Sequence, residues 1–586
     1  MNNQRNILLA VLLSLVFLFG WDAMVARLYP QPEGGQVVEG RVDTPAEQAA
    51  VAAANDTGMA DGAAPASAAG PVTLDAALGS ADRVRIDGPR IAGSINLRGA
   101  VIDDLVLKDY NESTDADSDP VRLFAPAGTP VQHYASFGFL ANGARLDGDT
   151  LWQADGEVLS PGRPLTLTHR AGGLVYSIVL TLDDAFMIDV VQRVDNVGTG
   201  AAVIQPFSLI ARTSETASED FFIAHSGPMG VFGGAADYDY GYDDVAEEGS
   251  VSPAGRPEWL GFTDIYWLSA LVPQTGGADA TFRSLGGDVF RADLIHDPVP
   301  LAAGRAISTR TRLFAGAKES GVLDAYEDAG IDKFGLAIDW GWFRWFEKPL
   351  LWLLKQLFAL VGNFGVAIIL LTVIVRGVMF PIAQKQFASM AAMKAIQPRM
   401  KKIQEAHKDD KLKAQQEMQA LFKEEGVNPL AGCLPLILQI PIFFALYKVL
   451  YLAIEMRHED FLYIDDLSAP DPATILNLFG ILPFDPPGFL AIGVLAVLLG
   501  FTMWLTFKLN PSTMDPMQQQ IFNIMPWLLM FVMAPFAAGL LIYWNASNIL
   551  TLAQQKYLYS RNPQLKAAAE AEKAEKAREA AKAERA

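Results

Sequence analysis

The sequence predicts a multidomain membrane protein in which an all-β domain joins an α-helical transmembrane core, with six transmembrane helices in total. Two populations of residues predict it: long uncharged apolar runs, nearly all after residue 350, and an acidic remainder that produces a net charge of −20. Before those runs, short segments alternate apolar and polar residues in the manner of β-strands. Lys and Arg are divided unequally among the loops, which orients the helices.

The N-terminal 75 residues are expected to form a membrane anchor and a linker. The apolar run 7–21 has the length of a signal-peptide core, but a poor cleavage context follows it. Residues 1–29 are therefore expected to remain as a transmembrane anchor, with a cleaved signal peptide as the alternative. Residues 30–75 are rich in Ala, Gly and Pro and contain no aromatic residue, which favours a flexible linker.

Residues 76–335 are predicted to form an all-β domain with two packed sheets. Segments such as 85–87 and 176–182 alternate apolar with polar residues, and clusters of Gly, Asn and Asp separate them. No long helical pattern appears before about residue 318. Four aromatic residues could line a sugar-binding face, but no convergent carboxylates lie near them, so packing is the preferred interpretation: Trp259, Phe262, Tyr266 and Trp267.

An interfacial helix, one span and four further spans are expected after the β-domain. Residues 336–350 interleave aromatic and charged side chains, which is typical of an amphipathic helix at the membrane interface; an extension of the next span is the alternative. Because a spanning helix needs ~20 residues, residues 351–380 are expected to form the second transmembrane helix. Residues 429–558 are expected to form four more, with a tight hairpin at Pro535 and Gly539.

The loops between the spans set the orientation. Residues 381–428 are predicted to form a helical hairpin with a break near 407–410, and residues 559–586 a solvated tail. The segment 381–425 carries nine Lys or Arg against six Asp or Glu, whereas the acidic loop 456–487 has a single Lys or Arg. Since basic loops stay in the cytoplasm, the hairpin and both termini are expected there, and the β-domain outside.

Arg376 is the most informative candidate for a functional residue. It lies more than a turn inside the cytoplasmic end of the second span, and a guanidinium at the bilayer centre costs ~2.5–3.5 kcal/mol. The side chain could snorkel to the headgroups or line a hydrated groove. Several polar residues of the spans favour the groove, although ordinary interhelical hydrogen bonding is an alternative for them: Thr372, Gln439, Asn523, Asn545, Ser547 and Asn548.

The composition does not indicate an enzyme. The single cysteine, Cys433, excludes an intramolecular disulfide, and no two of the six histidines have the spacing of helical metal ligands. No phosphate loop, dinucleotide fingerprint or nucleophile elbow is present. We therefore expect no catalytic residue, no metal site, no cofactor and no DNA partner.

Four motifs resemble those of one family. They are VRGVMFP at 375–381, GCLP at 432–435 followed by QIPIF at 439–443, DPMQQ at 515–519, and YWNASN at 543–548. With these motifs the chain resembles the YidC/Oxa family of membrane protein insertases, in its Gram-negative form. The resemblance covers the whole chain, although the β-domain matches more in placement and size than in residues.

The resemblance implies a periplasmic β-supersandwich domain, related to sugar-binding folds, and a five-helix transmembrane core in the bacterial inner membrane. It implies a groove open to the cytoplasm and to lipid, through which inner-membrane proteins are inserted and helped to fold, alone or with the Sec translocon. Arg376 would be the groove's charge, with Thr372 and Gln439 in its lining and Tyr543 and Trp544 as aromatic contacts. The implied partners are nascent membrane proteins, the Sec translocon, membrane lipids and, through the tail, the ribosome.

Two other classes of protein were weighed against an insertase. A secondary transporter or channel would also place an arginine among polar residues in a helical bundle, but it predicts inverted repeats, and the sequence shows no such symmetry. A membrane-anchored carbohydrate-binding enzyme of the envelope would leave the C-terminal motifs unexplained.

Overall fold

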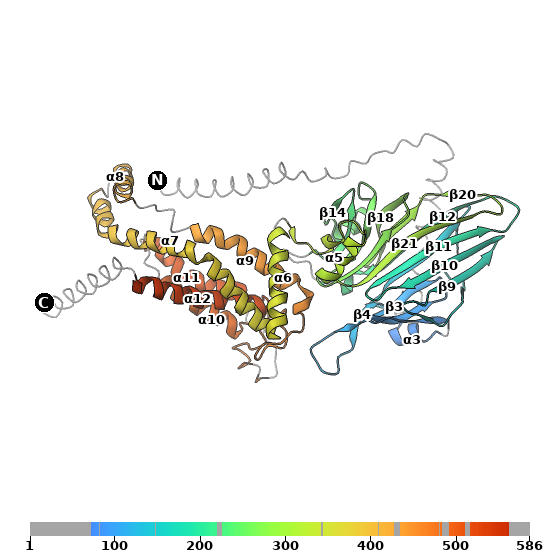
Figure 1. The fold of residues 1–586 in the computed structure, drawn as a ribbon, viewed down its shortest axis with the longest axis horizontal. Coiled ribbons are helices and arrows are strands. Elements are labelled where there is room, and N and C mark those ends of the chain that lie inside the picture. Colours follow the sequence, from blue (N-terminus) through green and yellow to red (C-terminus); the bar gives the residue numbers. More distant parts are fainter. Residues whose placement is uncertain are drawn as a thin grey trace.

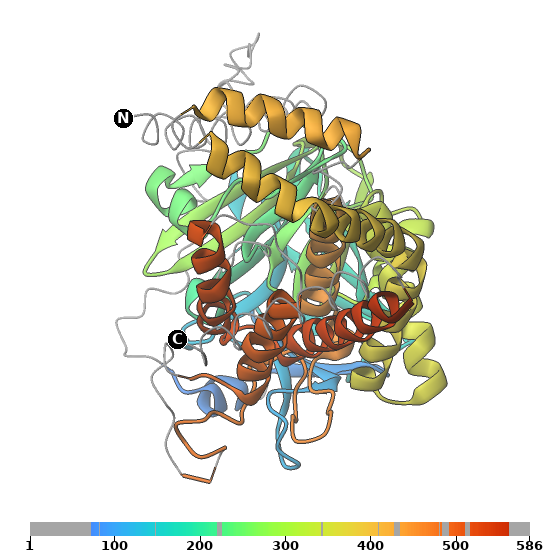
Figure 2. The same cartoon turned by 90° about the vertical axis from the view of Figure 1, so that its left-hand side faces the viewer.

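The computed structural model describes residues 72–561, with gaps at 81, 147, 219–224, 342–343, 408–409, 427–433, 480, 483–490 and 510–515. The predicted anchor 1–29, nearly all of the linker, the tail beyond 561 and Cys433 lie outside the described residues. A β-sheet domain and a helical bundle lie end to end along the long axis (Figure 1). Seen from the helical end, the bundle lies in front of the sheets (Figure 2).

The β-domain contains two sheets, as the sequence predicts. One has the order β15-β18-β19-β12-β5-β3-β2-β1-β8, with β20, β4 and β6 beside it. Its strands are β1 (Arg83–Asp87), β2 (Ile91–Asn96), β3 (Val101–Asn111), β4 (Pro120–Phe124), β5 (His133–Ala141), β6 (Ala144–Arg145), β8 (Val158–Leu159), β12 (Ala202–Thr213), β15 (Ser250–Val251), β18 (Ala278–Gly286), β19 (Val289–His296) and β20 (Val299–Leu301). Pairing is antiparallel except between β1 and β8.

The second sheet has the order β14-β13-β16-β17-β21-β11-β10-β9-β7 and is antiparallel. Its strands are β7 (Gln153–Ala154), β9 (Leu165–Ala171), β10 (Leu174–Leu182), β11 (Met187–Asn196), β13 (Gly227–Phe232), β14 (Ala235–Asp237), β16 (Pro257–Thr263), β17 (Trp267–Pro273) and β21 (Ala306–Ala317). Strand β10 shows why these residues form strands. Every second side chain, from Leu174 to Leu182, is apolar and buried, and the side chains between them are more exposed, so one face of the strand is buried.

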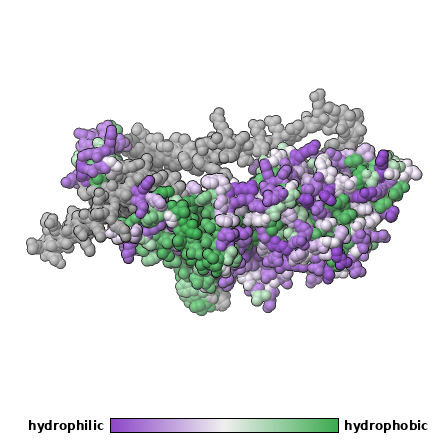
Figure 3. Space-filling view, in the orientation of Figure 1, coloured by the Kyte–Doolittle hydropathy of each residue, from purple (hydrophilic) through white to green (hydrophobic). Residues whose placement is uncertain are grey.

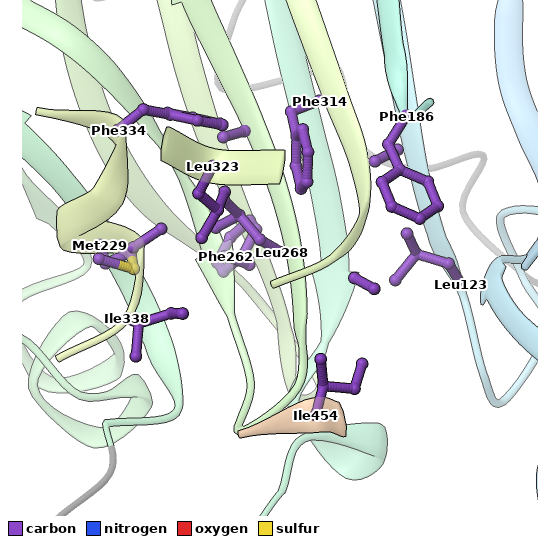
Figure 4. Packing of buried hydrophobic residues seen from close by; sticks show 14 of the residues in the cluster. Leu123, Phe186, Met229, Phe262, Leu268, Phe314, Leu323, Phe334, Ile338 and Ile454 are labelled. Carbon is purple, nitrogen blue, oxygen red and sulfur yellow. The ribbon is translucent and has the colours of Figure 1, made fainter. Parts of the chain in front are cut away.

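Three short helices belong to the β-domain: α3 (Leu74–Leu78), α4 (Tyr242–Glu248) and α5 (Ser320–Asp328). Figure 4 shows apolar side chains of both sheets, α5 and the 3₁₀ turn Phe334–Ala337 packed in one cluster, with Ile454 of the helical bundle at its edge. The core therefore continues from the β-domain into the bundle.

The bundle consists of α6 (Arg344–Val361), α7 (Phe364–Ala406), α8 (Lys411–Glu424), α9 (Leu434–Leu452), α10 (Val494–Leu509), α11 (Pro516–Met533) and α12 (Ala538–Arg561). The hairpin predicted at Pro535 and Gly539 is confirmed, because the chain turns between α11 and α12 there. The predicted break near 407–410 is also confirmed, since α7 ends at Ala406 and the Asp410 side chain accepts from the amide of Lys413 as the N-cap of α8.

The predicted boundary between the interfacial helix and the second span, at residues 350 and 351, is wrong. Helix α6 continues to Val361, and α7 begins only at Phe364. Gly362 has φ of +69°, and the Asn363 side chain accepts from the amide of Val366 as N-cap. A glycine and an asparagine inside an otherwise apolar run change the hydropathy little, so the pattern joined two helices that the backbone separates.

The first helix of the predicted cytoplasmic hairpin is a direct extension of the second span. Within the part of the chain that the structure describes, one helical segment, Phe364–Lys385, is long and apolar enough to cross a membrane. Three shorter apolar helical segments accompany it: Gln439–Leu452, Val494–Lys508 and Asn523–Met533. On the face that Figure 3 shows, hydrophobic residues cover the part of the bundle next to the β-domain, whereas hydrophilic ones dominate the surface of the β-domain and of α8.

Candidate functional site

Arg376 lies on α7 and its side chain is directed at α12. Its Nε donates to the hydroxyl of Ser547 over 3.0 Å, and a terminal guanidinium nitrogen donates to the same oxygen. Gln554, two turns further along α12, donates to the backbone carbonyl of Arg376. The guanidinium is therefore held between α7 and α12.

A second hydrogen bond joins α9 to the same face of α12. Gln439 Nε2 donates to the hydroxyl oxygen of Tyr543 over 3.1 Å. Tyr543 precedes Ser547 by four residues, so both side chains lie on one face of α12. We call the set Arg376, Ser547, Tyr543 and Gln439 the polar row. It crosses three helices, α7, α12 and α9.

Trp544 lies beside the polar row, on the side of α9. Its ring packs against the ring of Phe443, with a centroid distance of 4.7 Å. Exposed apolar side chains also occupy the outer surface of α9 and of α11: Ile440, Phe444, Ile524, Trp527, Leu528 and Phe531. The polar row is thus accompanied by exposed apolar faces on α9 and α11.

Asn545 and Asn548 do not join the polar row, although the sequence grouped them with Arg376. Asn545 donates to the carbonyl oxygens of Leu495 and Leu541, both over 2.9 Å, and accepts from Thr502. Asn548 donates to the hydroxyl of Thr502 over 3.1 Å. Both are buried between α12 and α10, so the alternative of ordinary interhelical hydrogen bonding describes them.

Thr372 is buried, and its hydroxyl donates to the carbonyl of Ile368, one turn back on α7, over 2.7 Å. Ser547, one of the polar residues noted in the last span, accepts a hydrogen bond from Arg376, whereas Gln554 and Thr502 were missing from the predicted site. The spacing of four between Tyr543 and Ser547 indicates that both lie on one face of α12. No sequence signal distinguishes the two faces of α12, because polar residues occur on both.

The end of the bundle nearest the β-domain is closed. The backbone amides of Ala538 and Gly539, at the start of α12, donate to the carbonyls of Ala469 and Leu467 in the loop that follows α9. A Cβ on Gly539 would lie 2.9 Å from the terminal methyl of Met456 and 3.1 Å from the carbonyl oxygen of Leu467, so the loop approaches the helix closely here. The loop therefore lies directly over this end of α12.

Contacts between the β-domain and the bundle fix that loop further. Arg457 donates to the carbonyl of Asn111 over 2.7 Å, and its guanidinium lies 5.4 Å from the ring centroid of Trp267. Tyr266 donates to the carbonyl of Tyr451. With Trp259 and Phe262 fully buried, the four aromatic residues pack in the core and between the domains, as predicted.

Charged side chains gather where the β-domain, α6 and α9 meet. Lys448 of α9 forms an ion pair with Asp339 over 3.3 Å. Lys318 is buried and donates to Thr263, and burial lowers the pKa of its ammonium group to about 8. Burial also raises the pKa of the Glu347 carboxyl to about 8, against the opposing effect of Lys448.

Among the residues that the structure describes, no group of three His, Cys, Asp or Glu side chains could hold a metal ion.

Comparisons with known proteins identify the family. A family model described as the 60Kd inner membrane protein matches residues 356–566, and one described as the YidC periplasmic domain matches residues 83–353. The membrane protein insertase YidC of Methylorubrum extorquens is 41% identical over 96% of this chain and 96% of its own length. That of Bradyrhizobium diazoefficiens is 41% identical over 96% of this chain and 97% of its own.

A solved structure described as an active YidC insertase with its first transmembrane domain resolved is 17% identical; it matches 81% of this chain and 92% of its own, with a TM-score of 0.34. Family membership rests on the sequence matches. This chain belongs to the YidC family of membrane protein insertases, which are inner-membrane proteins with a periplasmic domain.

Proposed function

We propose that this protein inserts inner-membrane proteins, and assists their folding, through a hydrophilic groove in which the polar row receives the polar part of the substrate. One observation carries the proposal: Arg376 lies inside the bundle, yet its guanidinium is bound to the neutral hydroxyl of Ser547. Among the described residues, no carboxylate forms an ion pair with it. Its charge is therefore available to an acidic group of a passing chain.

The polar row shortens the hydrocarbon path that a polar terminus must cross. An acidic residue of the substrate pairs transiently with Arg376, while Gln439 and Tyr543 offer further hydrogen bonds. The substrate's apolar helix then passes along the exposed faces of α9 and α11 into lipid, and its burial there drives the step. For a translocated acidic residue, the membrane potential adds ~2.3 kcal/mol per charge per 100 mV. No covalent bond changes, so neither a catalytic residue nor a cofactor is required.

The proposed topology has six spans, with the β-domain in the periplasm and both termini and the α7–α8 hairpin in the cytoplasm. The closed end of the bundle supports this orientation, because it adjoins the β-domain and would seal the groove on the periplasmic side. The hairpin would receive nascent chains, the tail would assist contact with the ribosome, and the Sec translocon would share some substrates. Thr372 and Trp544 complete the proposed groove; Asn545 and Asn548 brace α12 against α10.

Site-specific crosslinking tests the groove. Photo-crosslinkers at Gln439 and Trp544 should capture nascent chains of small membrane proteins, and depletion of the protein should abolish insertion of those substrates. The matched control is Trp352, an exposed aromatic residue of α6, a helix that contributes no residue to the polar row. Equal capture at all three positions would mean that the contacts are not those of a groove, and unimpaired insertion after depletion would exclude an insertase for these substrates.

The charge of Arg376 is tested separately. Arg376→Glu should impair substrates with acidic translocated segments more than neutral ones, because it replaces attraction by repulsion at the same position. Arg376→Lys keeps the charge and should retain most insertion. Equal loss for acidic and neutral substrates would remove the electrostatic role and leave only a role in hydrating the groove.

A further inference from the structure

An apolar lobe projects from the loop between α9 and α10. We define it as residues 474–482, in which no charged residue occurs. Its described apolar side chains are exposed, Ile481 by 77%: Ile475, Leu476, Leu478, Phe479, Ile481 and Leu482. The loop hangs below α6 and α10 in Figure 1, and in Figure 3 the hydrophobic surface of the bundle extends to the same lower edge. So many exposed apolar side chains in one short segment indicate a partner.

The backbone of the lobe is largely satisfied from within. Amides donate over 2.8–3.3 Å to carbonyl oxygens of the same loop or of Ile492, the donors being Ile475, Leu478, Phe479, Ile481 and Leu482. An irregular segment in water does not need such bonds, because solvent satisfies its amides. In hydrocarbon each unsatisfied amide is costly. The lobe thus presents apolar side chains outward and keeps its polar backbone inward.

Two bulky residues of the lobe hold an unfavourable conformation. Leu478 and Phe479 have φ of 53° and 63°, in the left-handed region where a Cβ is disfavoured. A water-exposed turn of this shape usually contains Gly or Asn. Burial of the two side chains in an apolar phase offsets this strain, whereas exposure to water adds to it.

The base of the lobe is fixed at the start of α10. The Asp471 carboxylate accepts from the amides of Ala473 and Leu495 over 3.0 and 2.8 Å, and Thr474 bridges to Gly493. Helix α10 has only 16 residues, which is ~24 Å, against a hydrocarbon core of ~30 Å. Because the lobe precedes this short helix and continues its exposed apolar surface at Leu498 and Phe501, it lies where the hydrocarbon would otherwise meet the end of the helix.

We propose that the apolar lobe is inserted among the phospholipid acyl chains of the outer leaflet, beside the periplasmic end of α10. Lipid is favoured over a protein partner because a protein interface combines apolar contacts with hydrogen-bonding groups at its rim, and the lobe has no charged side chain and few free amides. The proposal rests on the topology given above, in which this loop lies on the periplasmic side.

Spin labels in the full-length protein, reconstituted in lipid nanodiscs with Cys433→Ser, measure the surroundings of the lobe directly. Labels at Leu476→Cys and Ile481→Cys should collide with dissolved oxygen severalfold more often, relative to a water-soluble nickel chelate, than a label at the control Asp465→Cys in the exposed, acidic half of the same loop. Phe501→Cys, on the exposed surface of α10, provides the lipid reference. All four side chains are exposed, so the labels disturb little of the packing.

Each other result overturns the proposal. Frequent collisions with the chelate at Leu476 and Ile481 would place the lobe in water, and rare collisions with both reagents would mean that a protein segment or a second copy covers it. Labelling of Asp465→Cys in intact spheroplasts with a membrane-impermeant maleimide reports the side of the loop separately. A topology error is therefore distinguished from a lobe that does not enter lipid.

Discussion

Two arginines, one in each half of the molecule, show how differently the same side chain is used. In the β-domain, Arg212 forms an ion pair with Asp264 over 2.7 Å, and the two side chains are 4% and 5% exposed. In the bundle, Arg376 is held by the hydroxyl of Ser547 and has no carboxylate partner among the described residues. The paired charge joins two elements of the β-domain, whereas under the proposed function Arg376, which has no carboxylate partner in the described part of the chain, would offer its donors to a substrate.

The energetics explain the difference. A buried charge without a partner costs several kcal/mol, so Asp264 satisfies Arg212 and also accepts from Ser226 over 3.0 Å. A permanent carboxylate beside Arg376 would reduce that cost in the same way, but it would compete with acidic residues of a substrate. The incomplete pairing of Arg376 is the feature to expect of a site that must bind transiently and release.

The largest effect is expected from breaking the paired charge. Arg212→Ala leaves the carboxylate of Asp264 buried without its arginine, which should destabilise the β-domain by ~3–5 kcal/mol. Pulse proteolysis of the detergent-solubilised full chain measures this free energy of unfolding. Arg310→Ala is the control, because its ion pair with Asp189 spans 3.8 Å and its side chain is 57% exposed; that change should cost below ~1 kcal/mol. Similar costs for both would remove the contrast.

Glu347 tests whether an unpartnered buried group outside the groove is costly too. Its carboxyl is 1% exposed, and neither oxygen has a hydrogen-bond partner in the described structure. Burial raises its pKa from 4.5 to about 8, so the folded protein holds this proton over a range in which the unfolded chain releases it. The stability contribution is complete below pH ~4.5 and is lost as the pH rises through about 8, by up to ~4 kcal/mol.

The variant Glu347→Gln should therefore flatten the fall in unfolding free energy between pH 5 and pH 8. The measurement is the denaturation midpoint of the full chain across that range, with Asp465→Asn as an exposed control. A wild-type stability that does not fall with pH would show that the carboxyl is not protonated in the folded state.

A smaller effect is expected on the face of α12 opposite the polar row. Asn545→Ala removes two bonds to carbonyl oxygens and leaves those carbonyls buried, which should destabilise the bundle by ~1–3 kcal/mol. Insertion per folded molecule should stay unchanged, because Asn545 contacts α10 and not the groove. A selective loss of insertion without loss of stability would place Asn545 in the site after all.

The smallest change in stability is expected for the polar row itself. Gln439→Ala removes one hydrogen bond between α9 and α12, worth ~0.6 kcal/mol within membranes. Its effect should appear instead as reduced crosslinking of substrates near Trp544. If Gln439→Ala destabilised the bundle as strongly as Asn545→Ala, the hydrogen bonds of the polar row would serve to stabilise helix packing. Both faces of α12 would then have the same structural role.

Patterns local to the chain were sufficient for several features. The apolar runs, the basic hairpin and the acidic loop predicted a membrane protein with a β-domain, because hydropathy and charge act residue by residue on partition into lipid. The turn at Pro535 and the break before Asp410 were found for the same reason. The break at Gly362 was missed, because a single left-handed residue hardly alters the apolar run around it.

The sequence by itself predicted a membrane protein with a two-sheet β-domain and a helical bundle, and it pointed to Arg376 as the candidate functional residue. Only the tertiary structure decided which polar residues share a face: Ser547 and Tyr543 with Arg376, but Asn545 and Asn548 with Thr502. It also decided that the described apolar side chains of the lobe, such as Leu478 and Ile481, are exposed, whereas the preceding part of the same loop covers α12. The physical reason is that the rotation of each helix, and the path of each loop, depend on packing partners distant in sequence, which no local pattern encodes.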